Sequence, residues 1–385
     1  MSCDRGAFMQ KITFNIDRFD GKKRWQQQYK FEYKPNTLLA CLNMIKETQD
    51  DSLCFNQACG HCICGSCAVQ VNGSAFLACE TQLDELISTY NSHVFHVSPL
   101  QNFPVVRDLV VSFDEKSEKM KKVFPWMCEK NKRSQEHEHR QTAAERECFA
   151  AATDCILCGI CASECRELFY DNNSFLDPFM LNRAYRFARD SRDECEHVRI
   201  SACLDNNLWK CIHCKQCSSK CPKNIDIAQE VSYLRRKALA YGEFDCAGAR
   251  HANAFFDDLL ETGRLNEEAL ALKTEGLAAT LFRRTPFALR MMKAGKINPL
   301  QVFDKQPIKD IEQVQHLYYY AQKRREQLKQ QLAGQKQQAA GQYHCQAGQT
   351  KKEREHETQP QQTAQNVQLG HGEEQPVQLH QEGRG

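Results

Sequence analysis

Two runs of cysteine constrain this chain more than any other feature of its sequence. They read CILCGICASEC, from Cys155 to Cys165, and CIHCKQCSSKCP, from Cys211 to Pro222. Each follows the spacing C-x2-C-x2-C-x3-C, in which short loops let three thiolates bind one iron–sulfur cubane while the fourth reaches a second cluster. Two such runs in one chain therefore predict a pair of clusters with exchanged fourth ligands.

The role of the 22 cysteines in this 385-residue chain depends on the redox state of the compartment that holds it. The first residues, Met1–Gly6, contain no apolar secretory segment, so we expect a reducing environment in which clustered cysteines bind metal and do not form disulfides. No apolar run approaches the roughly 18 residues of a membrane-spanning helix. The net charge of +2 gives no electrostatic case for binding nucleic acid or an anionic membrane. Membrane contact would therefore come through a partner.

Residues 1–110 are expected to form a small domain built on a β-sheet. The hydrophobic pattern predicts two strands, a helix and a hairpin, in this order: Lys11–Phe19, Trp25–Tyr33, Leu38–Lys46, then Ala68–Val71 with Ser74–Leu77. Asn72-Gly73 between the last two strands is the strongest short hairpin signal. This order of elements is typical of a β-grasp.

A third set of cysteines lies inside this domain. Cys59, Cys64 and Cys67 follow C-x4-C-x2-C, and Cys79 comes after the hairpin. This is the plant-type spacing for a 2Fe–2S cluster, in which a loop supplies three thiolates and the hairpin returns the fourth. Two neighbours, Cys54 and Cys62, match no position of the pattern, and we interpret them as bystanders. His61 could replace one thiolate, as histidine does in Rieske centres.

The rest of the chain is expected to be helical or unstructured. Residues 111–149 form a charged connector, 150–245 a helical domain around the two clusters, 246–330 a helical extension and 331–385 a Gln-rich disordered tail. Within the helical domain, helices are expected over Met180–Arg189 and Asp226–Tyr241, and the arginines of the first either face a partner or form a solvated face. The predicted fold class is therefore α+β: a plant-type β-grasp domain, then an all-α domain like a two-cluster bacterial ferredoxin.

This layout resembles the iron–sulfur subunit of succinate dehydrogenase and fumarate reductase. The local sequence agrees over about residues 11–240, and the extension after about 245 is expected to lie outside the likeness. The shared segments are Cys64-Gly65-Ser66-Cys67-Ala68, Asn72-Gly73, Leu77-Ala78-Cys79, Cys155-Ile156-Leu157-Cys158, Ala184-Tyr185-Arg186-Phe187, Asp190-Ser191-Arg192-Asp193 and Cys221-Pro222-Lys223.

The resemblance implies ligands for three clusters. The 2Fe–2S cluster would be bound by Cys59, Cys64, Cys67 and Cys79, the 4Fe–4S cluster by Cys155, Cys158, Cys161 and Cys221, and the third cluster by Cys165, Cys211 and Cys217. In most family members the third cluster is 3Fe–4S, and the position three residues after Cys211 is not cysteine. This chain has Cys214 there. A fourth thiolate at this spacing favours 4Fe–4S, and a free cysteine beside a 3Fe–4S cluster is the alternative.

The chain also departs from the family after Cys165. Where the family commonly has proline and then tryptophans that help form a quinone pocket, this chain has Arg166 to Tyr170, so no quinone site is predicted at that place. His213 is either a relay residue beside the third cluster or a hydrogen-bonded loop histidine. Arg166, Glu167, Lys215 and Lys220 are expected to adjust the third site by their charge.

As a member of this family, the chain would transfer electrons while a partner subunit carries FAD and the fumarate or succinate chemistry. The other partner would be a quinone-reactive membrane anchor or a subunit with CCG motifs. The complex would lie peripherally on the inner membrane, on the cytoplasmic face by default or the periplasmic face if exported with a signal-bearing partner. The sequence indicates neither the direction of the reaction nor the quinone.

Three other functions remain open from the sequence. The chain could serve another flavoprotein, such as a thiol-driven fumarate reductase or an enzyme of the glycolate-oxidase or heterodisulfide-reductase kind. Subunits of the last two kinds generally lack a plant-type domain. It could be a structural zinc protein built on C-x2-C pairs, which would be colourless. It could also be a free iron–sulfur carrier or sensor, and the two-domain layout argues against this.

Overall fold

The computed structural model describes residues 11–128, 140–172, 174–243, 245–296 and 306–321, with residues 323–324 and 326–327. The predicted disordered tail, from residue 331, lies outside these residues. None of the described helices is long and apolar enough to cross a membrane.

The N-terminal domain is built on a five-stranded sheet with the order β2-β1-β5-β3-β4. Its strands are β1 (Lys11–Phe19), β2 (Arg24–Glu32), β3 (Ala68–Val71), β4 (Ser74–Leu77) and β5 (Val94–Ser98), and its helices are α1 (Leu38–Thr48) and α2 (Leu83–Tyr90). The predicted strands, helix and hairpin are all present, although β2 begins and ends one residue before the prediction. β5 pairs in parallel with β1 and antiparallel with β3, so it joins the hairpin to the rest of the sheet.

Hydrophobic alternation along β1 explains where the core of this domain lies. Ile12, Phe14 and Ile16 are fully buried, and α1 adds Leu38, Leu42 and Ile45 to the same core. Thr37 caps α1 by accepting a hydrogen bond from the N–H of Ala40. Near the end of β1 the side chain of Arg18 is also buried. It donates hydrogen bonds to the carboxylates of Asp50 and Asp108, which compensate its charge.

A short connecting region follows the sheet. It contains β6 (Val105–Arg107), β7 (Val110–Val111), α3 (Asp114–Met120), η1 (Lys121–Val123) and α4 (Ala143–Glu147). Lys116 of α3 is buried and pairs with the buried Asp177. Part of this charged connector is therefore packed against the helical domain. His137 and His139 of the connector, for which a solvated helix face is predicted and a metal site is the alternative, lie outside the described residues.

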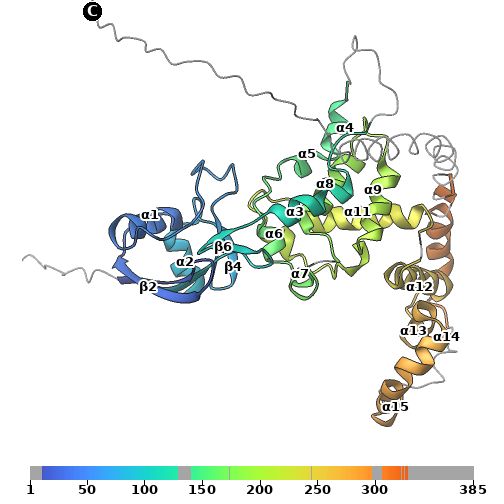
Figure 1. Ribbon diagram of the computed structural model, residues 1–385. Coiled ribbons are helices and arrows are strands. Elements are labelled where there is room, and N and C mark those ends of the chain that lie inside the picture. The colour runs from blue at the N-terminus through green and yellow to red at the C-terminus, as the bar shows by residue number, and fades with distance from the viewer. Residues whose placement is uncertain are drawn as a thin grey trace, which may run out of the picture. The chain divides into compact units, whose positions relative to one another are not determined.

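The second domain is helical, and Figure 1 shows its three main helices, α8, α9 and α11, packed side by side. Its elements are α5 (Ala150–Thr153), α6 (Ile160–Ser163), α7 (Arg166–Tyr170), α8 (Pro178–Ala188), α9 (Glu196–Asp205), η2 (Leu208–Lys210), α10 (Gln216–Ser219) and α11 (Ile227–Ala240). Leu181, Ile200 and Leu234 form part of the buried interface between the long helices. The α+β fold class predicted from the sequence is confirmed.

The arginines of α8 do not form the solvated face that the sequence suggested. Arg183 donates to the carbonyl oxygen of Cys155 at 3.2 Å, and Arg186 lies over the rings of Phe149 and Phe187. Arg189 lies over the ring of Tyr233 in α11. Three of these partners, Cys155, Phe149 and Tyr233, lie outside α8, so the arginines join it to other parts of the domain.

The chain continues as helices after α11. These are α12 (Ala247–Thr262), α13 (Glu267–Glu275), α14 (Leu277–Ala279), the π-helix η3 (Thr280–Arg284) and α15 (Thr285–Lys293), and residues 311–321 are also helical. α12 packs against η2 of the second domain, so the extension begins in contact with the helical domain.

Candidate iron–sulfur cluster sites

The first cysteine set lies in the loop between α1 and β3. The sulfur of Cys59 accepts hydrogen bonds from the N–H groups of His61, Ile63 and Cys64, at 3.3 to 3.4 Å. The loop can wrap around this sulfur because Gly60, Cys62 and Gly65 all have positive φ angles. Such N–H groups stabilise negative charge on a thiolate ligand, which is one way a protein adjusts the potential of a bound cluster.

The hairpin brings the other members of this set together. Cys67 immediately precedes β3 and Cys79 follows β4, and the N–H of Cys79 donates to the sulfur of Cys67 at 3.4 Å. Hydrogen bonding to Ser66 lowers the pKa of the Cys64 thiol to about 6, whereas burial raises the pKa of the Cys67 thiol to about 12. An iron–sulfur group would hold both sulfurs as thiolates.

The extra cysteines of this region point elsewhere. The thiol of Cys62 donates to a carboxylate oxygen of Glu80 at 2.9 Å, although the N–H of Cys62 reaches the sulfur of Cys79. The thiol of Cys54 donates to the carbonyl oxygen of Ser52. These contacts agree with the interpretation of Cys54 and Cys62 as bystanders. His61 contributes its backbone N–H to the loop.

A second set of cysteines lines a pocket in the helical domain. Three of them come from the first run and one from the end of the second: Cys155, Cys158, Cys161 and Cys221. The remaining wall is largely apolar, with Phe179, Ile225 and Ile227. Burial raises the pKa of the Cys158 thiol to about 12 and raises the pKa values of Cys155 and Cys161 as well. These buried thiols are therefore expected to ionise only when a cationic group binds beside them.

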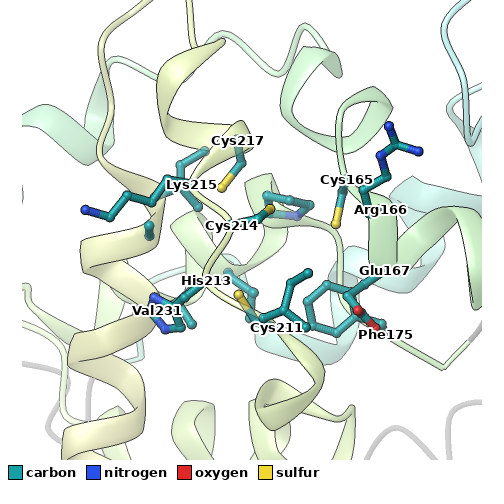
Figure 2. A pocket seen from close by; sticks show the side chains of 15 residues that line it. Cys165, Arg166, Glu167, Phe175, Cys211, His213, Cys214, Lys215, Cys217 and Val231 are labelled. Atoms are coloured by element: carbon teal, nitrogen blue, oxygen red, sulfur yellow. The ribbon is translucent and has the colours of Figure 1, made fainter.

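Figure 2 shows a third set of cysteines that lines another pocket. Cys165, the last cysteine of the first run, lies here with Cys211, Cys214 and Cys217 of the second. The two runs therefore exchange their last cysteines, as their spacing predicts. Among the described residues, no three His, Cys, Asp or Glu side chains converge closely enough to hold a single metal ion. The thiols of the second and third sets instead line the walls of two pockets.

The polar residues expected near the third set divide into two groups. Arg166, Glu167, His213 and Lys215 line the cavity, whereas Lys220 lies over the ring of Phe76, so its predicted role at this site is not supported. Burial, with the charges of Arg235 and Lys215, lowers the pKa of His213. This lowered pKa favours the neutral form of the imidazole.

The loops of the first two sites touch each other. A Cβ added at Gly65 would lie 2.7 Å from the Cβ of Cys158, so glycine allows the two ligand loops to meet. Across the same domain contact, Gln70 donates to the hydroxyl of Ser163 at 3.1 Å, and Asn102 donates to the carbonyl oxygen of Cys165. Sequence patterns gave no sign of these contacts, because each joins residues more than 60 positions apart.

Family models match both the N-terminal domain and the helical domain. Residues 13–119 match the 2Fe-2S iron-sulfur cluster binding domain, and residues 151–225 match the 4Fe-4S dicluster domain. The fold and the cysteine sets thus define a two-domain iron–sulfur protein of the electron-transfer class.

Individual relatives identify the family. The 8-methylmenaquinol:fumarate reductase iron-sulfur subunit of Wolinella succinogenes is 42% identical over 303 residues, which cover 77% of this chain and 94% of the relative. The succinate dehydrogenase iron-sulfur subunit of Coxiella burnetii is 32% identical over 235 residues, 59% of this chain and 97% of the relative. The chain therefore belongs to the family of iron–sulfur subunits of succinate dehydrogenase and fumarate reductase.

A solved structure has the same fold. A chain of the Mycobacterium smegmatis Sdh1 complex in the apo form matches with a TM-score of 0.55 and 24% identity, covering 62% of this chain and 98% of that chain. The extension was expected to lie outside the family likeness, and this expectation is wrong for the Wolinella relative. An alignment over 303 residues is too long to fit within residues 11–240, so part of the extension is shared.

Proposed function

We propose that this chain passes single electrons between a flavin-bearing subunit, where fumarate or succinate reacts, and a quinone-reactive partner at the membrane. As a family member it is the iron–sulfur electron-transfer subunit of such an oxidoreductase. The observation that carries the proposal is the exchange of the last cysteines of the two runs between two cavities. A ligand set that exchanges in this way is typical of a pair of iron–sulfur clusters.

The proposed ligands follow the three sets of cysteines. They are Cys59, Cys64, Cys67 and Cys79 for the 2Fe–2S cluster, Cys155, Cys158, Cys161 and Cys221 for the 4Fe–4S cluster, and Cys165, Cys211, Cys214 and Cys217 for the third cluster. We propose 4Fe–4S for the third cluster, because Cys214 lines the same cavity as the other three cysteines. A 3Fe–4S cluster beside a free Cys214 is the alternative.

Bound clusters of this kind accept and release one electron at a time, which suits a flavin that exchanges two. The chain's own groups set the conditions for this chemistry. Backbone N–H groups stabilise charge on the sulfur of Cys59, and the apolar wall with Phe179 and Ile227 excludes water from the second site. Gly65 keeps the first and second ligand loops in contact, which supports a short path between them.

Two observations support a quinone-reactive partner beside the third cluster: the name of the Wolinella relative and two exposed aromatic residues. The Wolinella relative is named for 8-methylmenaquinol and fumarate, and we propose a quinol of the menaquinol type as the electron donor here. Beside the third cavity, Phe169 and Tyr170 expose 54% and 80% of their surface. Their exposure supports a contact with an apolar partner surface. We propose a peripheral position at the membrane, held by partner subunits.

The test is anaerobic purification of the chain with its partners, followed by iron and acid-labile sulfide quantitation and EPR spectroscopy. We expect ten irons per chain if the third cluster is 4Fe–4S, counting two, four and four. Addition of a menaquinol-type quinol should reduce the clusters, and fumarate should reoxidise them through the flavoprotein. A complex without iron and sulfide after reconstitution would exclude the proposal, and stoichiometric zinc in a colourless protein would indicate a structural site.

The same preparation separates the other candidates. Copurification with a flavoprotein that reacts with neither fumarate nor succinate would favour another electron-transfer complex. Isolation of the native chain without any flavoprotein would favour a free carrier or sensor. The plant-type cysteine set supports the fumarate or succinate assignment over both.

A further inference from the structure

One segment of the C-terminal extension carries a local surplus of positive charge. The whole chain has a net charge of only +2, but residues 276–296 contain five cations and no Asp or Glu. The cations are Arg283, Arg284, Arg290, Lys293 and Lys296. Arg284 pairs with Glu275, just before the segment, and the side chains of the other four are exposed. The balanced total charge, which gave no electrostatic case for a membrane, therefore conceals this basic segment.

The basic segment is a defined helical element. α14, η3 and α15 follow one another from Leu277 to Lys293, and α14 and α15 are labelled in Figure 1. The helix ends at Gly295, whose φ of +68° lets the chain turn back. There the N–H of Lys296 donates to the carbonyl oxygen of Met291 at 2.9 Å. The spacing of its side chains can therefore be read as helical.

Apolar and basic side chains of α15 fall on different sides of the helix. Phe287 and Met291 are four residues apart and Met292 follows directly, so these three share one face. Arg290 and Lys293 are three residues apart and lie on the opposite face. α15 is therefore amphipathic, with cations as its only charged side chains.

The apolar face of α15 remains exposed in the described part of the chain. No residue of α15 is buried there. Phe282 of η3 exposes 86% of its surface, and Phe287 and Met292 of α15 expose 50% and 39%. A helix of a globular domain normally buries its apolar face against the core. Bulky apolar side chains that stay exposed opposite a row of cations are typical of helices that lie in a membrane interface.

We infer that η3 and α15 lie in the headgroup region of an anionic bilayer, with Phe282 and Phe287 toward the acyl chains and the cations at lipid phosphates. The bilayer fits both features, because acyl chains receive apolar side chains and anionic headgroups attract Arg and Lys. A nucleic acid would bind the cations but leave the apolar face in water. A protein groove would cover the apolar face but leave the cations on the opposite face without a partner.

This contact would give the chain a membrane attachment of its own, in addition to the one proposed through partner subunits. It does not depend on which cysteines bind clusters. The two proposals can therefore fail separately: cluster content tests the proposed function, and vesicle binding tests the attachment.

The test is flotation of the anaerobically prepared full-length chain with vesicles of phosphatidylcholine and phosphatidylglycerol. We expect binding that weakens at high salt and is about tenfold weaker with phosphatidylcholine alone, because anionic lipid attracts the cations. The double variant Arg290→Gln/Lys293→Gln should bind the mixed vesicles about tenfold more weakly than the parent. Phe282→Ser/Phe287→Ser should also lose about tenfold, because it removes the apolar contact.

Two control variants match these changes. Lys22→Gln/Lys23→Gln removes the same charge from the exposed turn between β1 and β2. Leu317→Ser removes an apolar side chain that is 73% exposed elsewhere in the extension. Both controls should bind mixed vesicles as the parent does. Unchanged binding by the variants of η3 and α15, or equal losses in the controls, would overturn the inference.

Phe287→Trp reports on this helix in the intact complex, where partner subunits also hold the protein at the vesicle. Lipids with brominated acyl chains quench a tryptophan that lies against them, so the fluorescence added by this variant should be quenched. The parent complex, with Trp25, Trp126 and Trp209, is the reference. If the serine variants do not fold, this measurement decides. A vesicle-bound complex whose added fluorescence is not quenched would overturn the inference, because α15 would then face water or another subunit.

Discussion

Gly65 and Cys158 lie in direct contact, although one belongs to the plant-type loop and the other to the first run of the helical domain. A Cβ at Gly65 would lie 2.7 Å from the Cβ and 2.8 Å from the Cα of Cys158. Real Cβ atoms do not approach other atoms so closely, and here the neighbour includes backbone, which cannot rotate away. The contact places the ligand loops of two proposed clusters against each other.

Gly65→Ala should therefore slow electron transfer between the first two clusters. The new methyl group must push the loops apart, and φ of +73° adds backbone strain. We expect a loss of turnover of about tenfold or more and weaker magnetic coupling between the two clusters in EPR, since small displacements in a preorganised site have large effects on rate. Gly73→Ala is the matched control, because Gly73 has a φ of +80° but no neighbour within 4 Å. Equal effects of the two variants would contradict this prediction.

Cys214→Ser should change the type of the third cluster. We expect the variant to lose one iron per chain and to gain the EPR signal of an oxidised 3Fe–4S cluster, because the fourth thiolate retains the fourth iron. Cys62→Ser is the control, since the Cys62 thiol is hydrogen-bonded to Glu80. Its iron content should equal that of the parent. A Cys214→Ser protein with unchanged iron and an unchanged oxidised spectrum would show that this thiolate is not a ligand.

Glu230 should make the protein less stable as the pH rises. Burial raises the pKa of its carboxyl to about 8, and the amide of Asn182 donates to both of its oxygens. Below pH 4.5 the carboxyl is protonated in both states, so its full contribution is present. Between pH 4.5 and 8 only the unfolded chain ionises, which lowers the free energy of unfolding by as much as about 5 kcal/mol.

Glu230→Gln removes this titration, so it should flatten the loss of stability between pH 5 and pH 8. The measurement is anaerobic urea unfolding of parent and variant at both pH values, with the difference between the two proteins as the readout. Titrating groups that the two proteins share contribute equally to the free energy of unfolding, so they cancel in this difference. An identical pH dependence in parent and variant would mean that Glu230 is already ionised in the folded protein.

Asp177→Asn should destabilise the contact between the connector and the helical domain. Asp177 is fully buried and pairs with Lys116, and Lys119 lies 3.5 Å from its other oxygen. Loss of the carboxylate leaves a buried ammonium group without compensation, which typically costs about 3–5 kcal/mol in the free energy of unfolding. Urea unfolding measures the change. Adding Lys116→Met to the variant should restore much of the stability, and a double variant no more stable than Asp177→Asn alone would refute this explanation.

Local sequence was enough to predict much of this protein. The alternation of Ile12, Phe14 and Ile16 and the turn at Asn72-Gly73 specified β1 and the hairpin, because both signals depend on residues a few positions apart. The spacing of the two cysteine runs likewise indicated an exchange of their last members, because each short loop limits where its thiols can reach. α2 and β5 were not predicted, and β5 is the strand that closes the sheet against β1.

The contacts between distant segments needed the folded chain. Whether Arg183 and Arg189 faced solvent, whether Lys220 reached the third site and what Gly65 adjoined all depended on which elements pack together. A side chain's partners come from every element around it, whereas its sequence neighbours describe only its own element. For this reason the grouping of the cysteines into ligand sets could be predicted along the chain. The surroundings of Cys211 could not, because Arg235, Trp209 and the backbone of α12 come from three separate segments that meet only in the folded protein.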